Sequence, residues 1–377
     1  MSTTSTPLNP NIVIIYGTNY TNNIIYGDST GTVNGNVTTS FELFGGAHAY
    51  NELVGDANYL DDYQHTVGNL LTGGDYSTNL MIGSAYYADS YKPGPNTGIL
   101  TIGANTIRGG VNSTNTAYGD AYDFTVYGVG GHNALYGGAN STNTMAGDAY
   151  FMGDFVTGGY NILVGGVHSL NILAGDATTM NGPVSGGQNH VTGGANSYNV
   201  LFGAAQTMDI ASDTSKNVVT GGADSTNYEY GDAQSVINDA IGGGNTVVGG
   251  GAGSTNYLYG DALTADYTLD GSGGGNTIVA GLDSVSYMWG TANTLTNPDH
   301  TVISGNTFVF ANGDHWADVE DFRHGLDTID LKGYAGLHAF SQLHIVAGNG
   351  VSDILLGTDQ LVVQTASALV ASDFKFG

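Results

Sequence analysis

A Gly-Asp pair recurs through most of the sequence, and carboxylates repeated in this way can bind cations. It ends segments such as NSTNTAYGDA at 112–121 and NSTNTMAGDA at 140–149. The repeated aspartates are Asp28, Asp56, Asp120, Asp148, Asp176, Asp232 and Asp261, and other copies carry Ser84, Ala204 and Thr291 in the same place. If successive copies stack at about 4.8 Å, neighbouring carboxylates repel each other by on the order of 1 kcal/mol in water. The fold must therefore offset this repulsion.

Two explanations of these aspartates remain open from the sequence. Each carboxylate could accept hydrogen bonds from turn amides, as an Asx cap does. Alternatively, Ca²⁺ ions between adjacent turns could combine the carboxylates with backbone, Asn and Thr oxygens to reach about six to eight ligands. Ca²⁺ is therefore the cofactor that we predict.

The aspartates belong to a longer repeat, measured from the asparagine that begins each Asn-x-aliphatic-x-Gly segment. The anchors Asn105, Asn133, Asn161, Asn189, Asn217 and Asn245 follow one another at intervals of 28 residues, and so do Asn115, Asn143, Asn171, Asn199 and Asn227. About ten copies cover residues 11 to 295, interrupted by KPGPNTG at 92–98, which indicates an inserted loop. A fixed period of this length is typical of a solenoid, whose units bury their apolar faces by stacking.

The anchored segments indicate strands, because they are short, rich in β-branched and aromatic residues and bounded by glycine. A weaker third strand in each copy is marked by the column Leu60, Phe124, Met152, Met180, Met208 and Val236. The residue two places after each anchor is almost always aliphatic, so strand alternation places both it and the asparagine inside. We predict an all-β fold: a β-helix or β-roll solenoid of about ten 28-residue turns, with stacked inward asparagines and a C-terminal β cap.

Composition excludes several classes of function. The chain has 33 acidic residues against 6 Lys and Arg, a net charge of −27 and no cysteine. This balance argues against nucleic-acid partners and against anionic membrane surfaces, because both require basic residues. No apolar run reaches about 18 residues, so we predict no membrane insertion. The first residues lack the basic and apolar regions of a signal peptide, so we expect export without one.

The C-terminal residues carry a different set of motifs. They are Phe308-Val-Phe310, Asp321-Phe322, Gly325-x-Asp327-x-Ile329-Asp330-Leu331-x-Gly333 and Ala371-Ser-Asp373-Phe374. Together they resemble the C-terminal module of RTX proteins, the calcium-binding proteins that bacterial type I systems secrete, as in serralysin-type proteases. The resemblance implies an uncleaved C-terminal secretion signal and contact with the type I secretion machinery. It also implies calcium ligands, for which the candidates are Asp314, Asp318, Asp321 and Asp327.

The sequence divides into three parts and carries no catalytic constellation. We predict an N-terminal tail at 1–10, a solenoid at 11–295 and an RTX-like module at 296–377. The chain lacks the HExxH motif of the related proteases, its histidines are scattered, and the solenoid has only Lys92, Arg108 and Lys216 as cations. We therefore predict that it is not an enzyme.

Aromatic residues follow the second anchor in three late copies, on the side that alternation places outside. They are Tyr228, Tyr230, Tyr257, Tyr259, Tyr287 and Trp289. Such a ladder could stack on sugar rings or pack against another chain. Alternatively, the rings stack on one another and only stabilise the sheet.

These features predict a secreted, extracellular or cell-surface structural protein: a surface-layer, matrix-filament or adhesin component, calcium-stabilised and self-associating. Self-association as an oligomer or filament is expected through the N-terminal end, where NIVIIYG at 11–17 enters the repeat at once, unless the segment with Pro7 and Pro10 folds across the strand edges. A cell-surface or matrix polysaccharide is a further candidate partner. The alternative function is a carbohydrate-binding module or a polysaccharide-acting β-helix enzyme.

Overall fold

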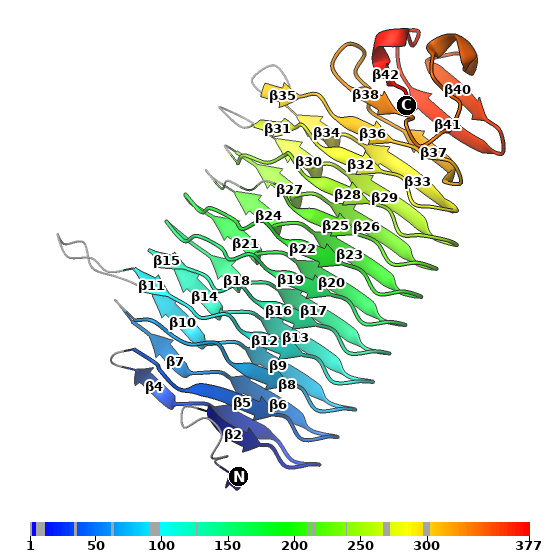
Figure 1. Cartoon of the computed structure of the whole chain (residues 1–377). Coiled ribbons are helices and arrows are strands. Elements are labelled where there is room, and N and C mark those ends of the chain that lie inside the picture. The colour runs from blue at the N-terminus through cyan, green and yellow to red at the C-terminus, as the bar shows by residue number, and fades with distance from the viewer. Residues whose placement is uncertain are drawn as a thin grey trace.

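The protein is a rod of stacked β-coils, with its N-terminal and C-terminal parts at opposite ends (Figure 1). About ten turns follow one another roughly 28 residues apart, which confirms the predicted solenoid. A computed structural model describes residues 2–4, 12–33, 36–61, 64–89, 99–125, 127–209, 212, 214, 216–238, 240–266, 272–296 and 302–377. The loop predicted at 92–98 lies outside these residues.

The first sheet collects one strand from each turn, in parallel except for its first member, which pairs antiparallel with the second. Its strands, in spatial order, are β1 (Ser2–Thr4), β2 (Ile12–Tyr16), β5 (Ser40–Phe44), β8 (Leu70–Thr72), β12 (Thr106–Arg108), β16 (Ala134–Tyr136), β19 (Ile162–Val164), β22 (His190–Thr192), β25 (Val218–Thr220), β28 (Thr246–Val248), β32 (Thr277–Val279), β36 (Thr307–Val309), β38 (Thr328–Asp330) and β42 (Phe374–Lys375).

The second sheet contains the strands that begin near the second asparagine of each repeat. They are β3 (Asn23–Tyr26), β6 (Tyr50–Val54), β9 (Thr78–Ile82), β13 (Thr114–Tyr118), β17 (Thr142–Ala146), β20 (Leu170–Ala174), β23 (Tyr198–Phe202), β26 (Thr226–Tyr230), β29 (Thr255–Tyr259), β33 (Ser284–Trp289), β37 (His315–Val319), β41 (Asp359–Gln364), β40 (Val351–Leu356) and β39 (His344–Gly348). The last three strands form antiparallel pairs, and the others are parallel and in register, with Asn115 opposite Asn143.

The third sheet follows each Gly-Asp pair. Its strands are β4 (Ser29–Val33), β7 (Ala57–Leu60), β10 (Ala85–Asp89), β14 (Ala121–Thr125), β18 (Ala149–Met152), β21 (Ala177–Asn181), β24 (Ala205–Asp209), β27 (Ala233–Ile237), β30 (Ala262–Asp266) and β34 (Ala292–Thr296). In the part of the chain that the structure describes, the remaining elements are two short strand pairs and two 3₁₀ turns: β11 (Leu100–Thr101) with β15 (Gly128–Val129), β31 (Ser272–Gly274) with β35 (Val302–Ser304), η2 (Phe340–Gln342) and η3 (Ala371–Asp373).

The apolar core runs along the inside of the rod. Every member of the third-strand column predicted from the sequence, from Leu60 to Val236, is fully buried. Each of these residues lies next to the residue at the equivalent position of the previous turn, as Met180 does next to Met152. Burial of apolar side chains by stacking of neighbouring turns is what makes a solenoid stable.

The sheets do not all end at the boundaries of the predicted three-part division, which stays a prediction. Strands β36 and β37 extend the first and second sheets beyond the boundary predicted at residue 296. In the described residues, β34 is the last strand of the third sheet. In the predicted tail, β1 lies across the edge of the first sheet by pairing with β2. Among the described residues, no helix has the length and apolar character needed to cross a membrane.

Candidate functional site

The inward asparagines of the second sheet form one continuous column. Asn115 Nδ2 donates to Asn143 Oδ1 at 2.9 Å, and Asn143 Nδ2 donates to Asn171 Oδ1 at 2.9 Å. Each amide also closes the bend before its strand, since Asn143 accepts from Gly138 N at 3.0 Å and donates to Gly138 O at 2.9 Å. The column, called here the second-sheet asparagine column, contains Asn23, Asn51, Asn79, Asn115, Asn143, Asn171, Asn199, Asn227 and Asn256.

The asparagines that precede the first-sheet strands form a second column with a different bonding pattern. The backbone N–H of Asn133 donates to Asn161 Oδ1 at 2.9 Å, and its side-chain Nδ2 donates across the interior to Gly147 O at 2.8 Å. The same pattern recurs from Asn105 to Asn276. These amides therefore join neighbouring turns and also brace opposite sides of one coil.

The repeated aspartates lie inside the rod beside this first-sheet asparagine column. Asp120 accepts from Gly131 N and from Asn133 Nδ2, both at 2.8 Å. Two turns further along the rod, Asp176 accepts a hydrogen bond from Gly187 N at 2.8 Å. Asp56, Asp120, Asp148, Asp176, Asp232 and Asp261, which we call the aspartate column, are all fully buried. Each carboxyl group thus spans the interior to a turn amide or a side-chain donor, as the hydrogen-bonding explanation predicts.

Burial dominates the electrostatics of the aspartate column. It raises the pKa to about 7 for Asp56, Asp120, Asp176 and Asp261. The pKa values of Asp148 and Asp232 are raised well above their usual range, first by burial and then by neighbouring carboxylates, which for Asp148 are Asp120 and Asp176. Asparagine and glycine donors oppose the shift, but they are too few to cancel it.

Calcium binding at the aspartate column stays a prediction, and the carboxyl groups there have protein hydrogen-bond donors around them. Calcium requires several oxygen ligands. The groups directed at these carboxyl oxygens include N–H donors of glycine and asparagine, the hydroxyls of Ser84 and Thr214 and, for Asp120 and Asp176, the carboxyl group of Asp148. Within the described ranges, no three His, Asp or Glu side chains converge as metal ligands would. Asp28 differs from the column because it is exposed. Calcium binding elsewhere on the rod stays a prediction.

The C-terminal aspartates predicted as calcium ligands are spread over separate contacts. Asp314 accepts from Ala311 N at 2.6 Å, and Asp318 from Gln364 Nε2 at 3.2 Å. Asp321 binds the backbone of the preceding turn, with Gly290 N at 2.6 Å and Thr291 N at 3.1 Å. Burial raises the pKa of Asp314 and of Asp321 to about 6. Asp321 thus joins the C-terminal part to the solenoid, whereas Asp314 and Asp318 accept from donors within the C-terminal part.

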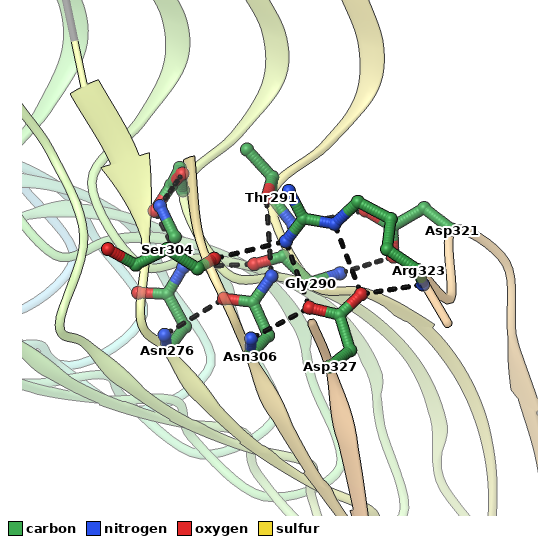
Figure 2. Close-up of polar contacts among 10 residues, drawn as sticks. Asn276, Gly290, Thr291, Ser304, Asn306, Asp321, Arg323 and Asp327 are labelled. Carbon is green, nitrogen blue, oxygen red and sulfur yellow. Dashed lines mark hydrogen bonds and ion pairs between the residues drawn. The ribbon is translucent and has the colours of Figure 1, made fainter. Parts of the chain in front are cut away.

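Asp327 ends the first-sheet asparagine column. Figure 2 shows Asn276, Asn306 and Asp327 in a row, where the backbone N–H of each asparagine donates to the next side chain at 2.9 and 2.8 Å. Arg323 then binds both carboxylate oxygens, with Nη2 to Oδ1 at 2.9 Å and Nε to Oδ2 at 3.1 Å. Arg323 Nη2 also donates to Ser304 O at 3.1 Å. A charged pair thus takes the place of the next asparagine.

Replacing Arg323 by alanine should lower the free energy of unfolding by about 2 kcal/mol, because hydrogen bonds to charged groups contribute about 1.5–3 kcal/mol and Asp327 would stay buried. Urea denaturation followed by circular dichroism measures the change. The matched control is Lys332→Ala, whose ammonium lies 3.5 Å from Asp330 and is 58% exposed. That variant should change stability by less than about 0.5 kcal/mol. Equal effects of the two variants would show that Asp327 needs no charged partner.

The aromatic ladder predicted from the sequence splits into two parallel stacks. Tyr228 and Tyr257 stack at 4.7 Å between ring centroids, and Tyr257 and Tyr287 at 5.2 Å. Tyr230, Tyr259 and Trp289 form the other stack, at 4.9 and 4.6 Å. Tyr230 and Tyr259 are only 4% exposed, so alternation placed them outside but did not reveal that they are covered. Because the rings cover each other's faces, the stacks fit the sheet-stabilising explanation better than sugar stacking.

A polar groove follows the bend between the first and second sheets. It has a volume of ≈ 780 Å³ and is lined by residues that include Tyr20, His48, Tyr76, Thr114, Asn140 and Thr142. A second hollow of ≈ 460 Å³ continues it and shares His168. The rings of Tyr20, His48 and Tyr76 stack at 4.9 and 5.0 Å along one part of the groove. The groove was not predicted from the sequence, although the repeated Ser-Thr pairs line it.

Glu229 is the residue that the sequence analysis missed. It occupies the inward apolar column of the second sheet, directly between Leu201 and Leu258. Its side chain is fully buried, and neither Oε1 nor Oε2 has a hydrogen-bond partner. The signal was available, because the residue two places after the anchor is aliphatic in the neighbouring repeats.

The fold and these interior columns define a class of protein, the β-solenoid repeat proteins. Comparisons with protein-family models, with curated proteins and with solved structures found no match to this chain. The resemblance of the C-terminal module to RTX proteins therefore stays a prediction from its motifs.

Proposed function

We propose that the protein is a non-enzymatic structural rod that serves outside the cell as a surface-layer, matrix or adhesive component. The observation that carries the proposal is the use made of the repeated residues. The second-sheet asparagine column links consecutive turns from Asn23 to Asn256, and the first-sheet column ends in the Arg323–Asp327 pair. The repeated polar residues are thus engaged in holding the coils together, which suits a mechanical role.

The extracellular location belongs to the same proposal and rests on the motifs of the C-terminal module. Their resemblance to RTX proteins implies export by the type I secretion machinery. The acidic composition of the chain, with a formal net charge of −27, supports a solvated rod that repels anionic partners. Calcium, expected from the same resemblance and from the repeated aspartates, would bind at these carboxylates, of which Asp28 is exposed.

Self-association is supported by strands at the ends of the sheets. In the described part of the chain, β34 is the last strand of the third sheet, and β3 and β4 are the first strands of the second and third sheets. Such edges present unpaired backbone groups that another chain can bind. The partner in this proposal is a second copy of the rod.

The alternative is a carbohydrate-binding module or a polysaccharide-acting enzyme, and the polar groove favours it. Hydroxyl and amide side chains such as Thr114, Thr142 and Asn140 line the groove along the rod, where an extended neutral glycan could bind. An anionic glycan would be repelled, because the chain has few cations.

Light scattering across a concentration series, with calcium and with a chelator, separates these functions. A structural component should grow in mass with concentration, by mass action, and give rods or filaments in electron micrographs. If calcium takes part, particle size should differ between the two conditions. A protein that stays monomeric in both conditions and is depleted or active on neutral polysaccharide would favour the alternative.

A further inference from the structure

Glu229 is buried in the middle of the rod without any of the partners that a charged carboxylate needs. The carboxyl group lies in the apolar column of the second sheet, and its neighbours along the column are Leu201 and Leu258. Both oxygens are inaccessible to water and lack hydrogen bonds. An isolated charge in such a place is so costly that the group takes up a proton instead.

The nearest backbone groups do not compensate for the missing partners. Oε1 lies against Gly221, where the absence of a Cβ leaves room for it. The N–H of Gly221 already donates to Val248 O at 3.0 Å, and the N–H of Gly250 to Asn256 Oδ1 at 2.9 Å. The carboxyl group thus meets donors that are already engaged.

No opposite charge faces Glu229 from the elements packed around it. Strands β23, β25, β28 and β29 contain no Asp, Glu, Lys, Arg or His, and the tyrosines of β23 and β29 lie on the outer side of the strands. Asp232, the next acidic residue along the chain, is directed elsewhere, to Thr214 Oγ1 and Gly243 N at 2.8 Å. Only the N–H of Gly250 opposes the effect of burial.

We propose that Glu229 is a proton-dependent switch in the middle of the rod: it binds one proton in the folded coil, and its ionisation opens the stack around β26. In the folded state the carboxyl is neutral and fits the apolar column. When the proton leaves for solvent, the carboxylate must reach water, which requires β26 to separate from β23 or β29. This inference goes beyond the structural role proposed above and does not depend on it.

The direction of the pH dependence follows from the burial of Glu229. Burial raises the pKa of Glu229 well above its usual range. The folded state therefore binds more protons than the unfolded state at every pH between the ordinary value of about 4.3 and the raised one. Over that interval stability decreases as pH rises, and one proton corresponds to about a tenfold change in the folding equilibrium per pH unit.

The experiment compares the full-length protein with Glu229→Leu and Glu229→Gln. Urea denaturation is measured between about pH 5 and about pH 9. Relative to Glu229→Leu, the folding equilibrium of the unsubstituted protein should fall by about tenfold per pH unit. Glu229→Gln, which cannot ionise, should run parallel to Glu229→Leu and serves as the second variant if the leucine does not fold. Parallel profiles for the protein with and without Glu229 would overturn the proposal.

Hydrogen exchange locates the opening. In the unsubstituted protein at alkaline pH, amides of β23, β26 and β29 should lose protection by at least tenfold relative to the same amides in Glu229→Leu, because opening exposes them. Strand β13, several turns away, should exchange alike in both proteins. The matched control is Glu42→Gln on the outer face of β5, where the side chain is partly exposed and should leave both profiles unchanged. Equal protection of β26 in the two proteins would mean that Glu229 does not act as a switch.

Discussion

Replacing Asn143 by alanine should lower the free energy of unfolding by about 3–5 kcal/mol, one of the two largest effects that we expect in this protein. The side chain makes four hydrogen bonds, two with Gly138 and one each with Asn115 and Asn171. Asn115 and Asn171 would keep their own glycine partners. The N–H of Gly138 would lose its side-chain acceptor, whereas its C=O would keep only the Ser169 hydroxyl at 3.1 Å. An unsatisfied buried group costs about 1–3 kcal/mol, and the bonds lost to Gly138 O, Asn115 and Asn171 add to this cost.

Urea denaturation measures this effect against a control on the same strand. Thr144 follows Asn143 in β17 but faces outward and is partly exposed, so Thr144→Ala should change stability by less than about 0.5 kcal/mol. Asn143→Asp is a second variant: it keeps an acceptor for Gly138 N but loses the donor to Gly138 O and Asn171. It should therefore be destabilised as well. A loss below about 1 kcal/mol for Asn143→Ala would mean that water replaces the amide.

The asparagine columns could be predicted because they depend on two local properties of the sequence. The 28-residue interval fixes which residues stack, and strand alternation fixes which of them face inward. Both properties hold at Asn115 and Asn143, whose side chains the structure places in contact at 2.9 Å. A strict repeat thus converts spacing along the chain into neighbours in space.

The partners of the aspartates could not be predicted in the same way. Gly131 and Asn133, which donate to Asp120, come from the far side of the coil, and their position depends on how the intervening segment turns. The sequence therefore left hydrogen bonds and calcium as alternatives. The burial of Tyr230 was not predicted for a related reason. Strand alternation indicates on which side of the strand a side chain lies, but not whether neighbouring side chains cover it.

Glu229 shows a different limit of the sequence analysis. The sequence shows that Glu229 departs from an apolar column, but the periodicity does not show whether such a side chain stays buried or what surrounds it. Only the structure shows that Leu201 and Leu258 enclose it without a polar partner. In our proposal, this departure from the repeat is the place where the stability of the rod depends on pH.

The second large effect is that the rod should be more stable at about pH 5 than at about pH 8. Burial raises the pKa of Asp56, Asp120, Asp176 and Asp261 to about 7, against an unfolded value near 3.8. The folded state then binds more protons than the unfolded state between these values, so stability falls as pH rises through this interval. A shift of three units at one group corresponds to about 4 kcal/mol, so the loss should reach at least that size for the column.

Salt and calcium distinguish the aspartate column from other causes of the same trend. Repulsion among exposed carboxylates also grows with pH in a chain of net charge −27, but salt at about 0.5 M screens it and leaves buried groups almost unaffected. The fall in stability between about pH 5 and pH 8 should therefore persist at high salt, and Asp148→Asn should reduce its slope by about one proton. If calcium restored full stability at about pH 8, and Asp148→Asn abolished that effect, the carboxylates would bind metal in spite of the donors around them. If the pH trend disappears at high salt, its cause is repulsion among surface carboxylates. Salt does not screen buried groups, because the ions stay in water.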